Sequence, residues 1–265
     1  MRTTKVLCGL LLLATATFTL KAGNTNGGVN FIAGYGQTPL RFEPNLGQAD
    51  SQARYLSRGN GYTMYFLPRQ IALALDVDTN SQTGPRTIGK HAARKFGLVY
   101  VQMEGANPNA AISGEETLPE KVNYFIGNDS SKWHTGISAF GRVHYQNVYP
   151  GVDLEFYGNQ SHLEYDFMIA SNANPSVIHL KLEGADQVTI ESDGDLAFSV
   201  QGRATRFGRP AIYQTINGVR HDISGGWQLH GNEASIEVGQ YDENLPLVID
   251  PVLSYSSFIG GTSET

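Results

Sequence analysis

Four acidic side chains stand at alternate positions in VDLEFYGNQSHLEYDFMI, residues 152–169, and grouped carboxylates can bind a cation or act as acid and base. Apolar and polar residues alternate on both sides of the Gly-Asn-Gln-Ser break, which predicts a β-hairpin. Its apolar face would hold Val152, Leu154, Phe156, Leu163, Tyr165 and Phe167. Its polar face would hold Asp153, Glu155, His162, Glu164 and Asp166.

The charges on the polar face of this hairpin should repel one another. With a turn at residues 159–160, Glu155 would face Glu164, and Asp153 would face Asp166. Like charges directly opposite each other on neighbouring strands are destabilising, so something should offset them. The explanations are bound Ca²⁺, a glycosidase pair of acid and base or nucleophile, and a solvated outer face with Arg or Lys from a neighbouring strand. We favour the solvated face, assign no catalytic residue, and keep these four carboxylates as candidate metal ligands.

A second acidic segment, DVDTNSQTG at residues 76–84, starts like a calcium-binding loop. Such a loop needs glycine at its sixth position and a bidentate glutamate at its twelfth. These positions hold Ser81 and Thr87, so an acidic turn is the preferred interpretation. The seven histidines are scattered and the single cysteine is Cys8, which matches no common zinc-site spacing. We therefore predict no cofactor, with Ca²⁺ at the hairpin as the open alternative.

Aromatic residues are plentiful, and most of them fall in strand-like runs where they are expected to form the core. We interpret Phe125, Phe156 and Phe167 in this way. Trp133 differs because it lies in the polar stretch NDSSKWHTG. It is the candidate surface contact, since an exposed indole can stack on a sugar or anchor a partner protein.

Turn signals recur along the chain at the spacing typical of hairpins. They are Pro68-Arg69, Asp193-Gly194, Asn217-Gly218 and Gly231-Asn232. Only residues 90–96 could form a helical turn or two. The pattern predicts an all-β, antiparallel, hairpin-rich domain with a β-sandwich-like arrangement and little helix; a barrel or blade-like sheets are the alternatives.

The N-terminus has the order of a secretory signal peptide. A basic head at residues 1–5 precedes the apolar run VLCGLLLL and then small residues, so we expect a signal peptide over residues 1–22. The apolar run is shorter than the about 20 residues of a membrane-spanning helix, so no transmembrane segment is predicted. Residues 23–40 would be a flexible lead-in. Cleavage removes three of the 19 basic side chains and none of the 25 acidic ones, leaving a formal charge of −9, which makes nucleic acid a poor partner.

Several segments resemble, in order along the chain, the N-terminal domain of bacterial SBBP proteins. They are RFEPNLGQAD, KVNYFIGNDSSKW, VHYQNVYPGVDLEFYG, LEYDFMI, GRPAIYQ and YDENLPLVIDPVLSYSSFIGG. In those secreted proteins a domain of unknown function precedes β-propeller repeats. The resemblance covers about Phe42 to Gly261 and implies a location and an architecture, but no reaction.

Together, the residues and the resemblance predict an all-β domain over residues 41–250, followed by the start of a truncated β-propeller repeat over residues 251–265. The expected function is a non-enzymatic structural or interaction module of a bacterial cell-envelope or extracellular protein. Its partners would be the propeller repeats of the same full-length protein and a surface glycan or protein. The alternatives are a carbohydrate-active hydrolase that uses the hairpin carboxylates and a calcium-stabilised adhesive module.

Overall fold

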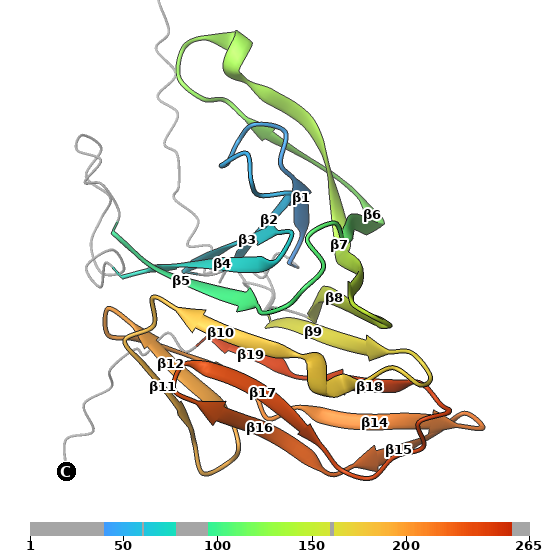
Figure 1. Cartoon of the computed structure of the whole chain (residues 1–265). Helices are drawn as coiled ribbons and strands as arrows, with labels where there is room; N and C mark the ends of the chain where they lie inside the picture. The colour runs from blue at the N-terminus through green and yellow to red at the C-terminus, as the bar shows by residue number, and fades with distance from the viewer. Residues whose placement is uncertain (1–39, 60, 78–94, 160–161, 256–265) are drawn as a thin grey trace, which may run out of the picture. The chain divides into compact units, whose positions relative to one another are not determined.

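The computed structural model describes residues 40–59, 61–77, 95–159 and 162–255, which lie within one compact unit (Figure 1). The predicted signal peptide, the lead-in up to residue 39, and most of segments 76–84 and 90–96 lie outside these residues.

The strands are β1 (Phe42–Pro44), β2 (Tyr55–Gly59), β3 (Tyr62–Leu67), β4 (Gln70–Asp76), β5 (Phe96–Met103), β6 (Ala111–Tyr124), β7 (His134–Tyr149), β8 (Val152–Asn159), β9 (His162–Ile169), β10 (His179–Glu183), β11 (Gln187–Ile190), β12 (Leu196–Val200), β13 (Arg203–Phe207), β14 (Ala211–Ile216), β15 (Val219–Ile223), β16 (Gly225–His230), β17 (Glu233–Val238), β18 (Leu247–Asp250) and β19 (Val252–Tyr255). Short 3-10 helices are η2 (Ser130–Lys132) and η3 (Pro175–Val177).

All strand pairs in the described part of the chain are antiparallel and join into one sheet. From one end, the pairing order is β16, β17, β10, β5, β4, β3, β2, β1, β7, β8 and β9. At β9 the sheet divides: β18, β14 and β15 continue from one half of the strand, and β19, β13, β12 and β11 from the other. Both branches reach β16, so the sheet is barrel-like and nearly closed. The all-β prediction is confirmed, and the barrel alternative describes this arrangement.

The interior of the barrel-like sheet is filled with apolar side chains. All six residues predicted for the apolar face of the β8–β9 hairpin are at most 5% exposed. Phe156 stands in a row of aromatic rings, with centroids 5.1 Å from Phe66 and 5.5 Å from Tyr165. Tyr165 in turn contacts Phe207. Alternation along the strands therefore produces one contiguous core.

The predicted turns lie where expected. Pro68-Arg69 joins β3 to β4, Asp193-Gly194 lies between β11 and β12, Asn217-Gly218 joins β14 to β15, and Gly231-Asn232 joins β16 to β17. At Asn217-Gly218 the φ angles are 52° and 80°, and two positive φ values match the right-handed twist of the flanking strands. These hairpins are thus encoded by local turn chemistry.

Strand β19 belongs to this sheet, although residues 251–265 are predicted to begin a propeller repeat. Val252 and Leu253 pair with β9, and residues 253–255 pair with β13. Leu253 is 4% exposed and is part of the core. The sheet therefore continues past the expected boundary at residue 250, at least as far as Tyr255.

The longest hairpin, β6–β7, extends beyond the pairing region of β1 and β8, and is drawn in green in Figure 1. We call residues 117–140 of this hairpin the arm. Sequence patterns did not indicate it, because β6 contains Pro119 and its pairing with β7 has two irregularities. The inner part of the arm is packed, since Ile137 and Ala139 are at most 1% exposed.

A buried carboxylate of β1 ties the arm to the sheet. The Glu43 side chain is 2% exposed; its oxygens lie 3.3 Å from Arg41 Nε and 3.4 Å from Arg58 Nη1. Tyr124, the last residue of β6, donates its hydroxyl hydrogen to Glu43 and accepts a hydrogen bond from Arg58. Burial, and then the hydrogen bond to Glu43, raise the pKa of Tyr124 to about 12, so its hydroxyl stays protonated. We call these four residues the Glu43 cluster.

Candidate functional site

Strands β8 and β9 form the predicted hairpin, but in a register shifted by two residues. Asn159 pairs with His162, so Glu155 lies opposite Asp166. Asp153 lies opposite Met168 and Glu164 opposite Tyr157, so the predicted pairings of Asp153 with Asp166 and of Glu155 with Glu164 are both wrong. A shift of two residues keeps every side chain on its predicted face, so alternation alone does not distinguish these registers. The polar face is the outer face of the sheet, and its carboxylates have partners of their own.

Arg142 of β7 offsets the charge of Glu155. Its Nη1 is 2.5 Å from a carboxylate oxygen of Glu155, and its Nε is 2.7 Å from Glu116. The guanidinium also lies over the ring of Tyr157, 5.0 Å from the centroid. The solvated-face interpretation anticipates such an arginine from a neighbouring strand.

Asp153, near the start of β8, contacts two residues of β7. One oxygen accepts a 2.6 Å hydrogen bond from the backbone N–H of Asn147, and the other lies 3.2 Å from His144 Nε2. The second ring nitrogen of His144 is 3.2 Å from Glu115. Asn147 has a φ of 51°, and its position coincides with a register irregularity in β7. Asp153 therefore stabilises the bulged part of β7.

Asp166 lies among other acidic side chains. It accepts a hydrogen bond of 3.1 Å from the hydroxyl of Tyr157. Burial, followed by the charge of Asp250 on β18, raises its pKa to about 6. The pKa of Asp250 is raised too, by burial and then by Glu164. The two aspartates come together because Ile249 pairs with Phe167, which extends the register to Asp250 beside Asp166.

The stability of the fold should therefore fall as Asp166 ionises. Its folded-state pKa lies above the ordinary 3.8, so its stabilising contribution is complete below pH 4 and is lost as pH rises through about 6. We expect Asp166→Asn to stabilise the protein at pH 8 by about 1–2 kcal/mol, a value reduced for partial solvent exposure. Urea unfolding at pH 4 and pH 8 measures this, with Asp222→Asn as the control, since the Asp222 side chain is 79% exposed. Equal pH dependence in Asp166→Asn and the unmutated protein would contradict the assignment.

The candidate metal ligands do not converge as a group. In residues 40–255, apart from the undescribed gaps, one set of three carboxylates has oxygens within 4.8 Å of one another: Glu191, Asp193 and Asp195 in the β11–β12 turn. Arg206 neutralises part of that charge, with Nη1 3.3 Å from Glu191 and 3.9 Å from Asp195. The hairpin carboxylates Asp153, Glu155, Glu164 and Asp166 form no such set, and calcium at the hairpin stays a prediction.

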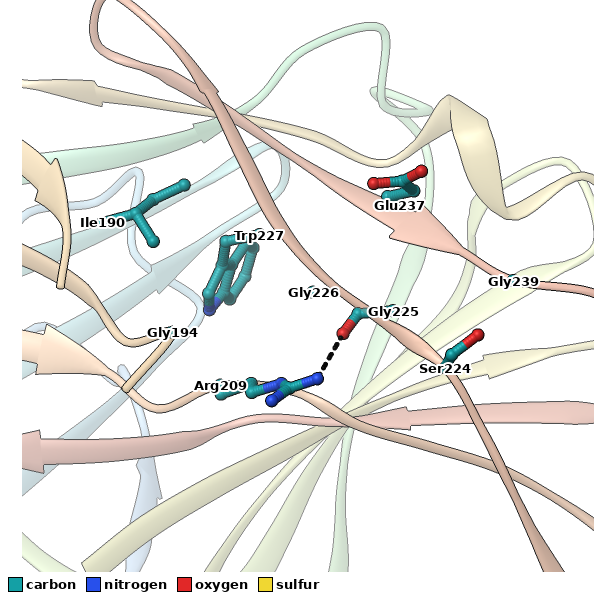
Figure 2. Close-up of a pocket in the computed structure, with 9 residues that line it drawn as sticks. All are labelled: Ile190, Gly194, Arg209, Ser224, Gly225, Gly226, Trp227, Glu237 and Gly239. Atoms are coloured by element: carbon teal, nitrogen blue, oxygen red, sulfur yellow. Dashed lines mark hydrogen bonds between the residues drawn. The ribbon is translucent and has the colours of Figure 1, made fainter. Parts of the chain in front are cut away.

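A pocket of about 430 Å³ opens where β16 approaches the β11–β12 turn (Figure 2). It is lined by Ile190, Gly194, Arg209, Ser224, Gly225, Gly226, Trp227, Glu237 and Gly239. The indole N–H of Trp227 donates to the carbonyl of Gly208 (2.9 Å), and Arg209 Nη2 donates to the carbonyl of Gly225 (3.3 Å). The polar groups of the pocket thus help to hold the β13–β14 connection against β16.

The tip of the arm exposes large apolar side chains. Phe125 is 65% exposed, Ile126 45% and Trp133 40%. The rings of Phe125 and Trp133 meet edge to face, with centroids 5.1 Å apart. Trp133 is thus at the surface, as expected of a surface contact, whereas the prediction that Phe125 belongs to the core is wrong. The run VNYFI reads as a buried strand, but β6 ends at Tyr124 and Phe125 follows it.

Several polar groups of the loop at the tip form hydrogen bonds within the arm. The carboxylate of Asp129 caps η2 by accepting hydrogen bonds from the backbone N–H and hydroxyl of Ser131. Asn123 Oδ1 accepts a bond from the N–H of Gly136, and the indole of Trp133 donates to the carbonyl of Gly127 at 3.2 Å. The aromatic pair is therefore held in a defined conformation while its faces stay exposed.

Fold and surface together define the class: an all-β domain built from one nearly closed antiparallel sheet, with an apolar tip on an anchored arm. Over residues 42–252 the chain matches the model of a family described as a domain of unknown function, DUF7948. The chain belongs to this family. No curated protein and no solved structure matches it.

Proposed function

We propose that this domain is a non-enzymatic interaction module and that the tip of the arm is its contact surface. The observation that carries the proposal is the exposure of Phe125, Ile126 and Trp133 together at one end of a hairpin. Large apolar side chains gathered on a surface are typical of binding sites, whereas scattered ones are ordinary. The Glu43 cluster and the capped loop hold the tip in position, which reduces the entropy lost on binding.

The partners of the hairpin carboxylates support a binding role over catalysis. Glu155 is engaged by Arg142, Asp153 by the backbone of Asn147, and Asp166 by Tyr157. These contacts account for three of the four carboxylates through neighbours within the sheet. A charged outer face of this kind is typical of a soluble β-domain surface.

We further infer that the module is exported and precedes β-propeller repeats in a bacterial envelope or extracellular protein. The basic, apolar and small-residue order of residues 1–22 supports export, and the resemblance to SBBP proteins supports the propeller. Within the described residues, no helix is long and apolar enough to cross a membrane. N-terminal sequencing of the mature protein tests export: a start near residue 23 supports it, and an intact Met1 in the cytoplasm contradicts it.

Photocrosslinking in the producing cell tests the contact surface. A photoreactive amino acid replaces Ile126 at the tip or, as the control, Val219, which is 58% exposed at the start of β15. We expect adducts from position 126 at least tenfold more abundant than from position 219, with mass spectrometry identifying the captured molecule. Equal or absent adducts at position 126 would contradict the proposed contact.

A further inference from the structure

We infer that the tip of the arm docks on a lipid surface, inserting its aromatic pair at the boundary between head groups and acyl chains. The inference rests on the proposed function and names the partner class of the same surface. Leu46, in the β1–β2 connection, is a further exposed apolar side chain (58%), and the adjacent Gly47 lies against the ring of His134, which follows Trp133 in the sequence. We call Leu46, Phe125, Ile126 and Trp133 the apolar tip.

The hydrogen-bonding state of the tip favours an apolar medium over a sugar. Asn123, Asp129 and the indole N–H of Trp133 already have partners within the loop. A saccharide is held by directed hydrogen bonds, and Asn123 Oδ1, Asp129 Oδ1 and the indole N–H already form such bonds within the arm. An aromatic pair whose N–H is satisfied can leave water without leaving an unpaired donor, which removes the main cost of burying an indole.

The form of the tip favours a deformable partner over a flat protein surface. A stable protein interface buries about 800 Å² per partner, which needs some 20 residues per side. The apolar tip has four exposed apolar residues, three of them between β6 and β7 and the fourth, Leu46, in the β1–β2 connection. A lipid interface needs no complementary shape, and Trp and Phe are the side chains that prefer the head-group level.

The charges beside the tip indicate which lipids it would accept. Lys132 ends η2 and Asp129 caps its start, while Lys121 and Glu120 lie on β6. These formal charges cancel, so the tip offers no basic cluster for anionic head groups. Binding should therefore come from the apolar side chains, with Lys132 able to reach a head-group phosphate while its stem stays near the acyl chains.

Vesicle partitioning of the full chain tests the inference. We expect binding to phosphatidylcholine vesicles with a blue shift of Trp133 emission, recorded in a Trp227→Phe background because the chain has two tryptophans. The double variant Phe125→Ser, Ile126→Ser should bind at least tenfold more weakly, and the matched control Val219→Ser should bind like the unmutated protein. Unchanged far-ultraviolet circular dichroism shows that the variants are folded.

Three results would overturn the lipid assignment. The first is that the unmutated chain does not bind vesicles. The second is that Val219→Ser weakens binding as much as the double variant does. The third is that the chain binds anionic vesicles only and that the double variant binds them equally well. The crosslinking experiment separates this failure from failure of the proposed function. Protein adducts at position 126 in the absence of vesicle binding would support the contact surface and reject the lipid assignment. If adducts and vesicle binding are both absent, the contact surface and the lipid assignment are both rejected.

Discussion

Replacing Phe156 by alanine should cost the domain about 3–5 kcal/mol of unfolding free energy, because it removes a buried aromatic ring and leaves a cavity. Phe156 is 5% exposed, and three rings lie around it, those of Phe66, Tyr145 and Tyr165. Its strand, β8, lies between β7 and β9, so the surrounding backbone is paired on both sides and has little freedom to collapse into the cavity. Urea unfolding followed by fluorescence measures the loss, provided that the slope against urea concentration is unchanged.

Phe125→Ala is the matched control for this measurement. The same side chain is 65% exposed at the tip of the arm, so its removal should change stability by no more than about 0.5 kcal/mol. The two phenylalanines lie in similar apolar runs of the sequence, and the structure alone distinguishes them. Equal losses in both variants would mean that the tip is buried in the folded protein.

Glu43→Gln should release the arm from the sheet at a cost of about 2–3 kcal/mol, since hydrogen bonds to a buried charge are among the stronger ones. The carboxylate of Glu43 accepts from Arg41, Arg58 and Tyr124, and an uncharged amide replaces one acceptor oxygen with a donor. The NH₂ group would then face the guanidinium of Arg41 or that of Arg58, depending on which oxygen it replaces, and a guanidinium cannot accept a hydrogen bond. Amide hydrogen exchange should therefore accelerate in the arm, residues 117–140, more than in β8 and β9.

Glu120→Gln provides the comparison for Glu43→Gln. Glu120 is an exposed residue of β6, and the same chemical change there should leave both stability and exchange in the arm near their original values. An unchanged exchange rate in the arm of Glu43→Gln would show that β6–β7 pairing alone positions the tip. Tip binding measured by vesicle partitioning should weaken with Glu43→Gln if orientation of the arm matters, even though no tip residue is changed.

The β8–β9 hairpin shows which features local sequence can and cannot determine. Alternation of apolar and polar residues predicts its buried face correctly, because a strand projects successive side chains to opposite sides. The register is two residues away from the predicted one. Both registers bury the same side chains, and the strands that pair with the other edge of β9, β18 and β19, come from a distant part of the chain.

The candidate site depends even more on distant contacts. Trp133 is predictable as a surface residue because its neighbours in the sequence are polar. The sequence around Phe125 does not indicate that this side chain is exposed and packs edge to face against Trp133. The Glu43 cluster joins residues separated by 15 and 81 positions. No periodic pattern links these positions, since each belongs to a different strand with its own alternation.

Turn residues and two-residue periodicity in this chain specify the all-β class, the hairpins at Pro68-Arg69, Asn217-Gly218 and Gly231-Asn232, and the inward face of most strands. Those features follow from backbone geometry within a few residues, where a positive φ or an apolar side chain has one favourable place. The near closure of the sheet, the entry of β19 between β9 and β13, and the anchoring of the arm arise only in the folded chain. They require pairing between segments far apart in sequence, and the free energy that selects such pairings comes from packing and charge partners that meet only when the whole sheet has formed.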